Sequence, residues 1–226
     1  MLTNPVWNAL ISRQASISEG NDLARRFPAD IGPFAGLHSL TPEAWNALKP
    51  LVLPNDPITV PLNVYAAPPD DWELLHVFSI TQMVLEQPLP SKRNEKGLEP
   101  MALTSADVPD MLALTELTKP GPFRQRTQEV GRYIGFRENG RLVAMAGERM
   151  QLDGYTEISA VCTHPEFAGR GYASQLMTAV AQGILADGHT PFLHVLTENV
   201  SAIHVYEKLG FRTVRPIWAV LAQPHL

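Results

Sequence analysis

The sequence predicts a mixed α/β protein in which helices flank a mostly antiparallel central sheet, preceded by a smaller α/β unit. Three strand-like segments joined by tight-turn dipeptides indicate the sheet, and a glycine-rich loop that opens a helix follows them. A stretch rich in prolines and charges, residues 87–97, lacks apolar periodicity and separates the two parts. We therefore expect a small domain over residues 1–90 and a second domain over residues 98–226.

Composition narrows the class of protein. Of 226 residues, 45% are hydrophobic and 18% are charged, which is typical of a globular protein, and no apolar run approaches the ~20 residues of a membrane helix. The N-terminus has neither a basic segment nor an apolar core, so no secretory signal is expected. We expect a soluble, cytoplasmic protein that does not bind a membrane.

Charge and metal-ligating residues exclude further classes. A formal net charge of -5 without a basic run argues against a nucleic-acid partner, because phosphate binding depends on clustered Lys and Arg. Cys162 is the only cysteine, so neither an intrachain disulfide nor a sulfur-ligated metal cage can form. The seven histidines are scattered without a metal-binding spacing, and no metal is expected.

The first half shows four segments with regular patterning and no recognisable chemistry. Residues 5–12 and 42–51 are expected to be helices, and residues 58–65 and 72–85 are expected to be strands. Its aromatic residues Trp7, Phe34 and Trp45 are expected in the core. The function of this half cannot be read from its residues.

The second half begins with an expected strand at residues 98–103 and a helix opened by Thr104, with Asp107 three positions later as in a capping box. A short second helix is expected near residues 124–129. Strands at residues 133–138, 141–150 and 155–163 follow, joined by the dipeptides Asn139-Gly140 and Asp153-Gly154. Because such dipeptides favour two-residue hairpin turns, the three strands should be antiparallel.

The remaining elements alternate between helix and strand. Apolar residues recur at helical spacing from 171 to 186, and Gly188 stands where a left-handed cap would end that helix. A strand at residues 191–197 follows. Asn199 is a suitable N-cap for a last helix through residue 209, Gly210 ends it, and residues 211–221 return as a strand.

The loop at residues 168–174, Ala-Gly-Arg-Gly-Tyr-Ala-Ser, follows a strand and opens a helix. Glycines let consecutive backbone N–H groups converge on phosphate oxygens at a helix N-terminus, and Arg170 could add a charge. The loop is neither a Walker loop nor the spaced dinucleotide fingerprint. Taken alone, the tripeptide is equally typical of a plain tight turn.

Two sequence motifs that follow one another in the expected order favour a cofactor-binding role for this loop. Residues 156–165, Thr-Glu-Ile-Ser-Ala-Val-Cys-Thr-His-Pro, running into Gly169-Arg170-Gly171-Tyr172-Ala173, resemble motif A of the GNAT superfamily of N-acetyltransferases, and residues 199–211 resemble motif B. The resemblance covers residues 98–221 and implies a GNAT-type sheet and an acetyl-CoA cosubstrate. A degenerate GNAT-like copy is one interpretation of the first half.

The sequence departs from the family pattern at Ala168, where Arg or Gln is usual, whereas Gly171 and Ala173 fit. Because backbone N–H groups supply most phosphate contacts in this motif, the change should weaken binding without abolishing it, and Arg170 could compensate. The resemblance implies that the cofactor is held by the following residues: Val161, Cys162, Thr163, Ala168, Gly169, Arg170, Gly171, Tyr172, Ala173, Ser174, Asn199, Ala202 and Tyr206.

The resemblance also implies direct attack by a primary amine on the thioester. Glu157 is the candidate base, the alternative being that it pairs with an arginine or faces solvent, and Glu148 is the reserve. Tyr206 is the candidate acid for the departing thiolate, the alternative being simple packing. Cys162 has no paired base on its strand, so we expect a buried structural thiol.

Two other classes remain open at this stage: a coenzyme A binding or sensing module without turnover, and an interaction protein whose loop is only a turn. The acceptor, a small molecule or a peptide, is expected to be chosen by residues 116–130 and by parts of the first half.

Overall fold

The computed structural model describes residues 1–87, 89 and 99–225. Most of the expected linker, residues 87–97, and Leu98 therefore lie outside the described residues. Within the described part of the chain, no helix is long and apolar enough to cross a membrane.

Residues 1–87 contain two short α-helices and five strands. A three-stranded antiparallel sheet forms from β1, β2 and β3, and α1 lies directly on β3, where a Cβ at Gly36 would come within 2.3 Å of the Trp7 backbone nitrogen. Trp7, Phe34 and Trp45 are buried, as predicted. The elements are α1 (Pro5–Ile11), β1 (Glu19–Gly20), β2 (Ala24–Arg26), β3 (Ala35–Leu37), α2 (Pro42–Leu48), β4 (Ile58–Leu62) and β5 (Trp72–Leu85).

The second half follows the predicted order. Its elements are β6 (Met101–Leu103), α3 (Val108–Thr118), the 3-10 turn η4 (Thr127–Val130), β7 (Tyr133–Glu138), β8 (Arg141–Leu152), β9 (Tyr155–Thr163), α4 (Tyr172–Ala186), β10 (Thr190–Leu196), α5 (Val200–Lys208) and β11 (Phe211–Pro224).

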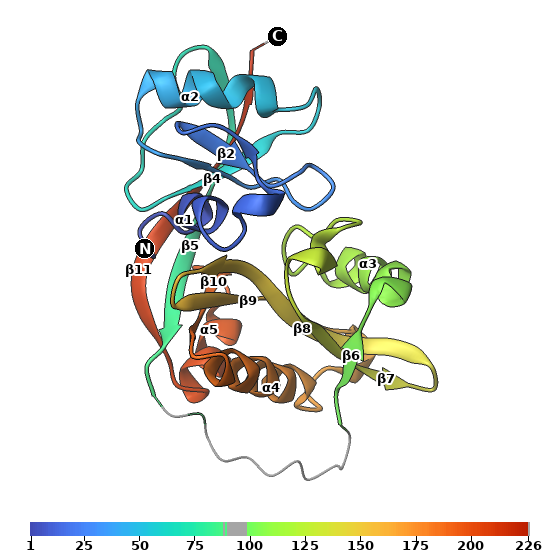
Figure 1. The fold of residues 1–226 in the computed structure, drawn as a ribbon. Helices are drawn as coiled ribbons and strands as arrows, with labels where there is room; N and C mark the ends of the chain where they lie inside the picture. The colour runs from blue at the N-terminus through green and yellow to red at the C-terminus, as the bar shows by residue number, and fades with distance from the viewer. Residues whose placement is uncertain (88, 90–98, 226) are drawn as a thin grey trace.

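One eight-stranded sheet joins the two halves, in the order β4-β11-β5-β10-β9-β8-β7-β6. Neighbouring strands are antiparallel except β9 and β10, which are parallel. Strand β5, from the first half, pairs with β10 on one edge and β11 on the other. Figure 1 shows β5 and β11 running together from the N-terminal unit down to the level of α5.

Helices cover both faces of the large sheet. Alternate residues of β8 separate the faces: Ala144 and Ala146 pack against α4, whereas Met145 packs against α3. On β10, Leu193 packs on the α4 face and Phe192 packs with α1 on the other. Helices α1 and α3 therefore share the face opposite α4, which we call the α3 face.

Most local predictions are confirmed, and so is the mixed, mostly antiparallel sheet. Thr104 and Asp107 form the expected capping box, and Asn139 and Gly140 have the positive φ angles, 51° and 81°, of a tight hairpin. Some boundaries differ. The second short helix is a 3-10 turn that begins at Thr127 and not at residue 124, and β11 continues to Pro224 in place of residue 221 because it pairs with β5 along its whole length.

Candidate functional site

A fork between β9 and β10 lies near the centre of the large sheet. Their parallel pairing runs from Tyr155 with Thr190 to Ile158 with Leu193 and then stops. Beyond that point β9 stays with β8 up to Thr163, and β10 stays with β5 up to Leu196. The facing edges of the two strands thus have backbone groups without a strand partner in the part of the chain that the structure describes.

A β-bulge at Ala160 lies just past the end of this pairing. Gly147 of β8 is opposite Ser159 and Met145 is opposite Cys162, so two residues of β9 occupy the space of one residue of β8. Ala160 adopts a φ of 52°, which costs about 1–3 kcal/mol in a residue other than glycine. Since a bulge bends and twists its strand, it turns the end of β9 away from β10 and redirects its N–H groups.

The glycine-rich loop leads from the end of β9 into α4. Gly169 and Gly171 have φ angles of 75° and 82°, and Gly171 caps the helix without a side-chain bond to it. The first N–H groups of a helix have no partner within the helix, and the first turn of α4 carries no acidic residue. The loop and helix start, including Tyr172, Ala173 and Ser174, therefore form a suitable site for an anion.

Two side chains of this loop, Arg170 and Tyr172, are bound within the protein. Arg170 pairs with Glu138 at 3.2 Å and stacks over Phe167 at 4.6 Å, so its charge is already partnered. The Tyr172 hydroxyl also binds Glu138 and ties the helix start to β7. Ala168 is exposed and offers only its backbone. An anion here would be bound chiefly by main-chain N–H groups.

Helix α5 borders the other side of the fork, close to the end of β10. Asn199 caps it by accepting a hydrogen bond from Ala202 N–H at 3.1 Å. Ala202 and Tyr206 pack on the α4 face, where the Tyr206 ring meets Phe211 edge-on. Burial raises the pKa of Tyr206 to about 12, so its hydroxyl keeps its proton at neutral pH.

The three residues expected along the fork lie at the end of β9. Val161 and Thr163 are half-buried, and the Thr163 hydroxyl is buried without a partner among the described residues. Cys162 is buried on the α3 face, and burial raises the pKa of its thiol to about 11. The thiol is therefore protonated near neutral pH, which agrees with the structural role predicted for it.

Glu157 lies on the α3 face and is completely buried, in a polar network that the sequence did not reveal. Arg149 binds its two carboxylate oxygens through Nε at 2.8 Å and a terminal nitrogen at 2.7 Å. His194 approaches Glu157 through Nδ1 at 2.8 Å, and Gln82 Nε2 lies 3.0 Å from both His194 Nε2 and the Leu2 carbonyl oxygen. Arg149, Glu157, His194 and Gln82 form what we call the buried polar row.

The partners of His194 determine its tautomer. Gln82 Nε2 can only donate, so His194 Nε2 must accept, and the ring proton on Nδ1 is donated to Glu157. Glu157 thus binds the Arg149 guanidinium and the Nδ1–H of His194. The pairing of Glu157 with an arginine is the alternative that the sequence left open, and it does not exclude a part in proton transfer.

The electrostatics of the row set the basicity of Glu157. Burial alone would raise the pKa of its carboxyl, but the Arg149 charge and the hydrogen bonds from Arg149 and His194 outweigh burial and hold the pKa at about 2. A carboxylate with this pKa is a weak base for an ammonium, whose pKa is about 10. The other nitrogen in the row that can accept a hydrogen bond is His194 Nε2, which faces Gln82 Nε2.

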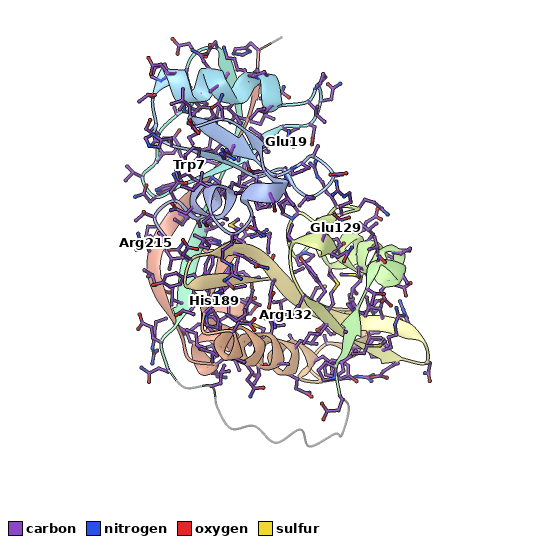
Figure 2. The ribbon with its side chains drawn as sticks, in the orientation of Figure 1. Trp7, Glu19, Glu129, Arg132, His189 and Arg215 are labelled. Carbon is purple, nitrogen blue, oxygen red and sulfur yellow. The ribbon has the colours of Figure 1, made fainter. Side chains whose placement is uncertain are left out.

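Glu148, the reserve base, lies on the other face. It is opposite Ile158 of β9, which packs against α4, and it is bound by Arg132 Nε at 2.8 Å. Arg132 also reaches Asp187 beyond the end of α4 at 2.6 Å. Figure 2 shows Arg132 next to α4. Glu148 therefore does not join the buried polar row.

The segment expected to choose the acceptor, residues 116–130, borders a hollow of about 550 Å3 on the outer side of α3. Its lining consists of Leu112, Thr115, Glu116, Lys119, Gly121, Pro122 and Phe123. Arg124 and Arg126 anchor the end of this segment to the first half through Asp56 at 2.6 Å and Asp30 at 3.2 Å. These two ion pairs tie the segment that follows the hollow to the first half.

Sequence reasoning missed four residues that shape the site: Gln82, Arg149, Ala160 and His194. No local signal identifies them. Arg149 and Gln82 are buried polar positions in strands whose partners the sequence does not specify, and Ala160 is not a residue type that marks positive φ. Among the described residues, no group of three or more His, Cys, Asp or Glu could hold a metal ion.

Comparison with known structures identifies the family. A solved acetyltransferase described as a GNAT-family member from Novosphingobium aromaticivorans is 38% identical, with a TM-score of 0.91 over 100% of this chain and 99% of that chain. The chain belongs to the GNAT family. The family model FR47-like protein also matches residues 133–219, within the region that carries the GNAT motifs.

More distant GNAT structures share the fold. A GCN5-related N-acetyltransferase from Kribbella flavida is 14% identical, with a TM-score of 0.67 over 100% of this chain and 98% of that chain. An acetyltransferase from the GNAT family of Colwellia psychrerythraea is 13% identical, with a TM-score of 0.53 over 88% and 84%. A search of functionally curated proteins gave no match.

The pH dependence of the free energy of unfolding tests the ion pair between Glu157 and Arg149. A lowered folded-state pKa adds stability that is complete above about pH 4.5 and is lost as the pH falls through about 2. Glu157→Gln should lower the free energy of unfolding at pH 7 by about 3 kcal/mol, because it leaves Arg149 buried without its carboxylate. Urea unfolding between pH 7 and pH 2 measures both effects.

The exposed Glu116 provides a matched control, since Glu116→Gln should change the free energy of unfolding by less than about 0.5 kcal/mol. Glu157→Gln should also lose less stability than the wild type below pH 4.5. Equal acid sensitivity in wild type and Glu157→Gln would contradict the ion pair.

Proposed function

We propose that this GNAT protein transfers the acetyl group of acetyl-CoA to a primary amine of a small-molecule or peptide acceptor by direct attack. The fork between β9 and β10 carries the proposal, because it leaves strand edges free next to an anion site at the start of α4. A cofactor with a diphosphate and an amide-containing arm matches both features.

In this proposal the diphosphate binds the N–H groups of Gly169 to Ser174, as glycines and a helix start allow. The pantetheine arm enters the fork and pairs with the backbone of Val161 to Thr163, as an added strand would. Asn199 and Ala202 at the start of α5 border the arm on the β10 side. Gly171 is central because a side chain there would project from the loop that surrounds the phosphates.

The amine nitrogen then attacks the thioester carbon, a C–N bond forms, and the C–S bond breaks. Backbone N–H groups near the Ala160 bulge stabilise the oxyanion of the intermediate. The proton that leaves the amine goes to the pair of Glu157 and His194. Glu157 acts through His194. When the hydrogen bond from Gln82 to His194 Nε2 breaks, that nitrogen takes the proton, and the Glu157 carboxylate stabilises the imidazolium that forms.

The departing thiolate needs a proton or a hydrogen bond. Tyr206 holds its proton in the unliganded chain, because burial raises its pKa to about 12. A thiol has a pKa of about 8.5, so Tyr206 stabilises the thiolate by donating a hydrogen bond, and solvent completes protonation. This is the acid role that the sequence predicted for Tyr206, in a more limited form.

A coenzyme A binding or sensing module without turnover is the second candidate function. The pairing of Arg170 with Glu138, the alanine at position 168 and the burial of Glu157 favour it. Each of these features is compatible with binding the cofactor and less suited to rapid chemistry. Two measurements, of cofactor binding and of turnover, separate this candidate from acetyl transfer.

The first measurement is thermal melting with acetyl-CoA, and the second is thiol release with a panel of amines, amino acids and peptides. A ligand at 100 times its Kd should add about 2.7 kcal/mol of stability. Stabilisation together with amine-dependent thiol release supports the enzyme. Stabilisation without release from any amine supports the binding module, and the absence of both contradicts the two candidates.

Gly171→Val tests the phosphate loop. The variant should raise the Kd for acetyl-CoA at least tenfold, because the side chain blocks close approach to the loop and a positive φ disfavours it. Gly154→Val is a matched control: its φ is 75°, nothing lies within 4 Å of the added Cβ, and it belongs to the hairpin between β8 and β9. Calorimetric titration measures both, and wild-type affinity in Gly171→Val would contradict the loop's role.

Tyr206→Phe tests the leaving-group role. Removal of the hydroxyl should lower kcat about 10–100-fold, since one hydrogen bond to a developing charge is lost, and it should leave the Kd for acetyl-CoA unchanged. Steady-state kinetics with a saturating amine, together with direct titration, separate the two effects. An unchanged kcat would limit Tyr206 to packing.

A further inference from the structure

The hydroxyl of Tyr133 is an unexplained polar group on the α3 face. Tyr133 is the first residue of β7, it is 3% exposed, and its hydroxyl has no hydrogen-bond partner among the residues that the structure describes. A buried polar atom without a partner costs about 1–3 kcal/mol, so native chains rarely retain one without a use. A group bound on the α3 face would give this hydroxyl the hydrogen-bond partner that it lacks among the described residues.

The ring of Tyr133 crosses the sheet toward β9. Its partner on β8 is Gly147, and a Cβ at Gly147 would lie 2.2 Å from Tyr133 Cδ1, so the ring rests directly on that glycine. Gly147 is in turn opposite Ser159, the residue before the bulge. The absence of a side chain at position 147 is what lets the ring extend across β8.

The Tyr133 ring lies near residues that take part in the proposed mechanism. Tyr133 shares a packed cluster with Ala160, the bulge residue at the fork. Burial raises the pKa of the Tyr133 hydroxyl, and the charges that also act on it are Arg149, Glu157 and Glu148. The hydroxyl stays protonated and lies close enough to Arg149 and Glu157 of the buried polar row for their charges to act on it.

Phe123 connects this position to the outer hollow. Its ring meets the Tyr133 ring edge-on, with centroids 5.6 Å apart, and Phe123 also lines the hollow of about 550 Å3 beside α3. Phe123 thus contacts both the hollow and the Tyr133 ring, so an acceptor bound in the hollow would lie one aromatic ring away from Tyr133.

We infer that the Tyr133 hydroxyl binds the attacking nitrogen of the acceptor amine. The inference rests on the proposed acetyl transfer and assigns one further residue to it. An N–H of the amine donates to the Tyr133 oxygen, which leaves the nitrogen lone pair free to face the thioester carbon at the bulge. Tyr133 is thus a substrate-binding residue, and the proton that leaves the nitrogen still goes to His194.

Tyr133→Phe removes only this oxygen. The kcat/KM for the best amine found by thiol release should fall about 10–100-fold, because the amine loses its hydrogen-bond acceptor. The Kd for acetyl-CoA should stay unchanged, and the melting temperature should stay equal or rise, since an unpartnered buried hydroxyl is removed. A purely structural role for the hydroxyl predicts a lower melting temperature and an unaltered kcat/KM.

Tyr155→Phe is the matched control, because Tyr155 is a half-buried tyrosine at the start of β9 that packs edge-on against Phe192. It should retain the wild-type kcat/KM. If Tyr133→Phe keeps kcat/KM within twofold of a measurable wild-type value, the inference is wrong while acetyl transfer stands. If the wild type releases no thiol with any amine, acetyl transfer fails and the role of Tyr133 fails with it.

Discussion

The end of hydrogen bonding between β9 and β10 is the constraint on which the site depends. Backbone N–H and C=O groups inside a sheet need partners, and two strands that diverge lose them along their facing edges. Here each diverging strand is held by its outer neighbour, β9 by β8 and β10 by β5. The bulge at Ala160 makes the divergence local, so the remainder of the sheet keeps its pairing.

The first half of the chain takes part in this arrangement directly. Strand β5 holds β10 from the far side, and Gln82 on β5 connects His194 to the Leu2 carbonyl oxygen. Arg124 and Arg126 connect the segment after α3 to Asp56 and Asp30 in the first half. The polar row is therefore built from both halves, and the first half holds the segment that follows the hollow, although the family motifs lie only in the second half.

Local signals in the sequence were sufficient for most elements. The Asn139-Gly140 hairpin, the capping box at Thr104 and the Asn199 cap each depend on residues within four positions of one another, so the sequence contains the whole cause. The position of Glu157 on a motif strand was also predictable. Its environment was not, because Arg149 reaches it only through the irregular register between β8 and β9.

Long-range pairing explains what the sequence did not reveal. The pattern of residues 72–85 predicts a strand but does not specify that it lies between β10 and β11. The same kind of long-range pairing brings Glu138 next to Arg170 and places the Tyr133 ring against Gly147. Such contacts depend on the relative positions of distant strands, which single-residue preferences do not determine.

A crystal structure of the complex with acetyl-CoA tests the central claim most directly. The account predicts that the pantetheine arm lies between β9 and β10, hydrogen-bonded to the backbone of residues 161–163, with the diphosphate at the start of α4. A cofactor bound elsewhere, with β9 and β10 paired beyond Ile158 and Leu193, would contradict it.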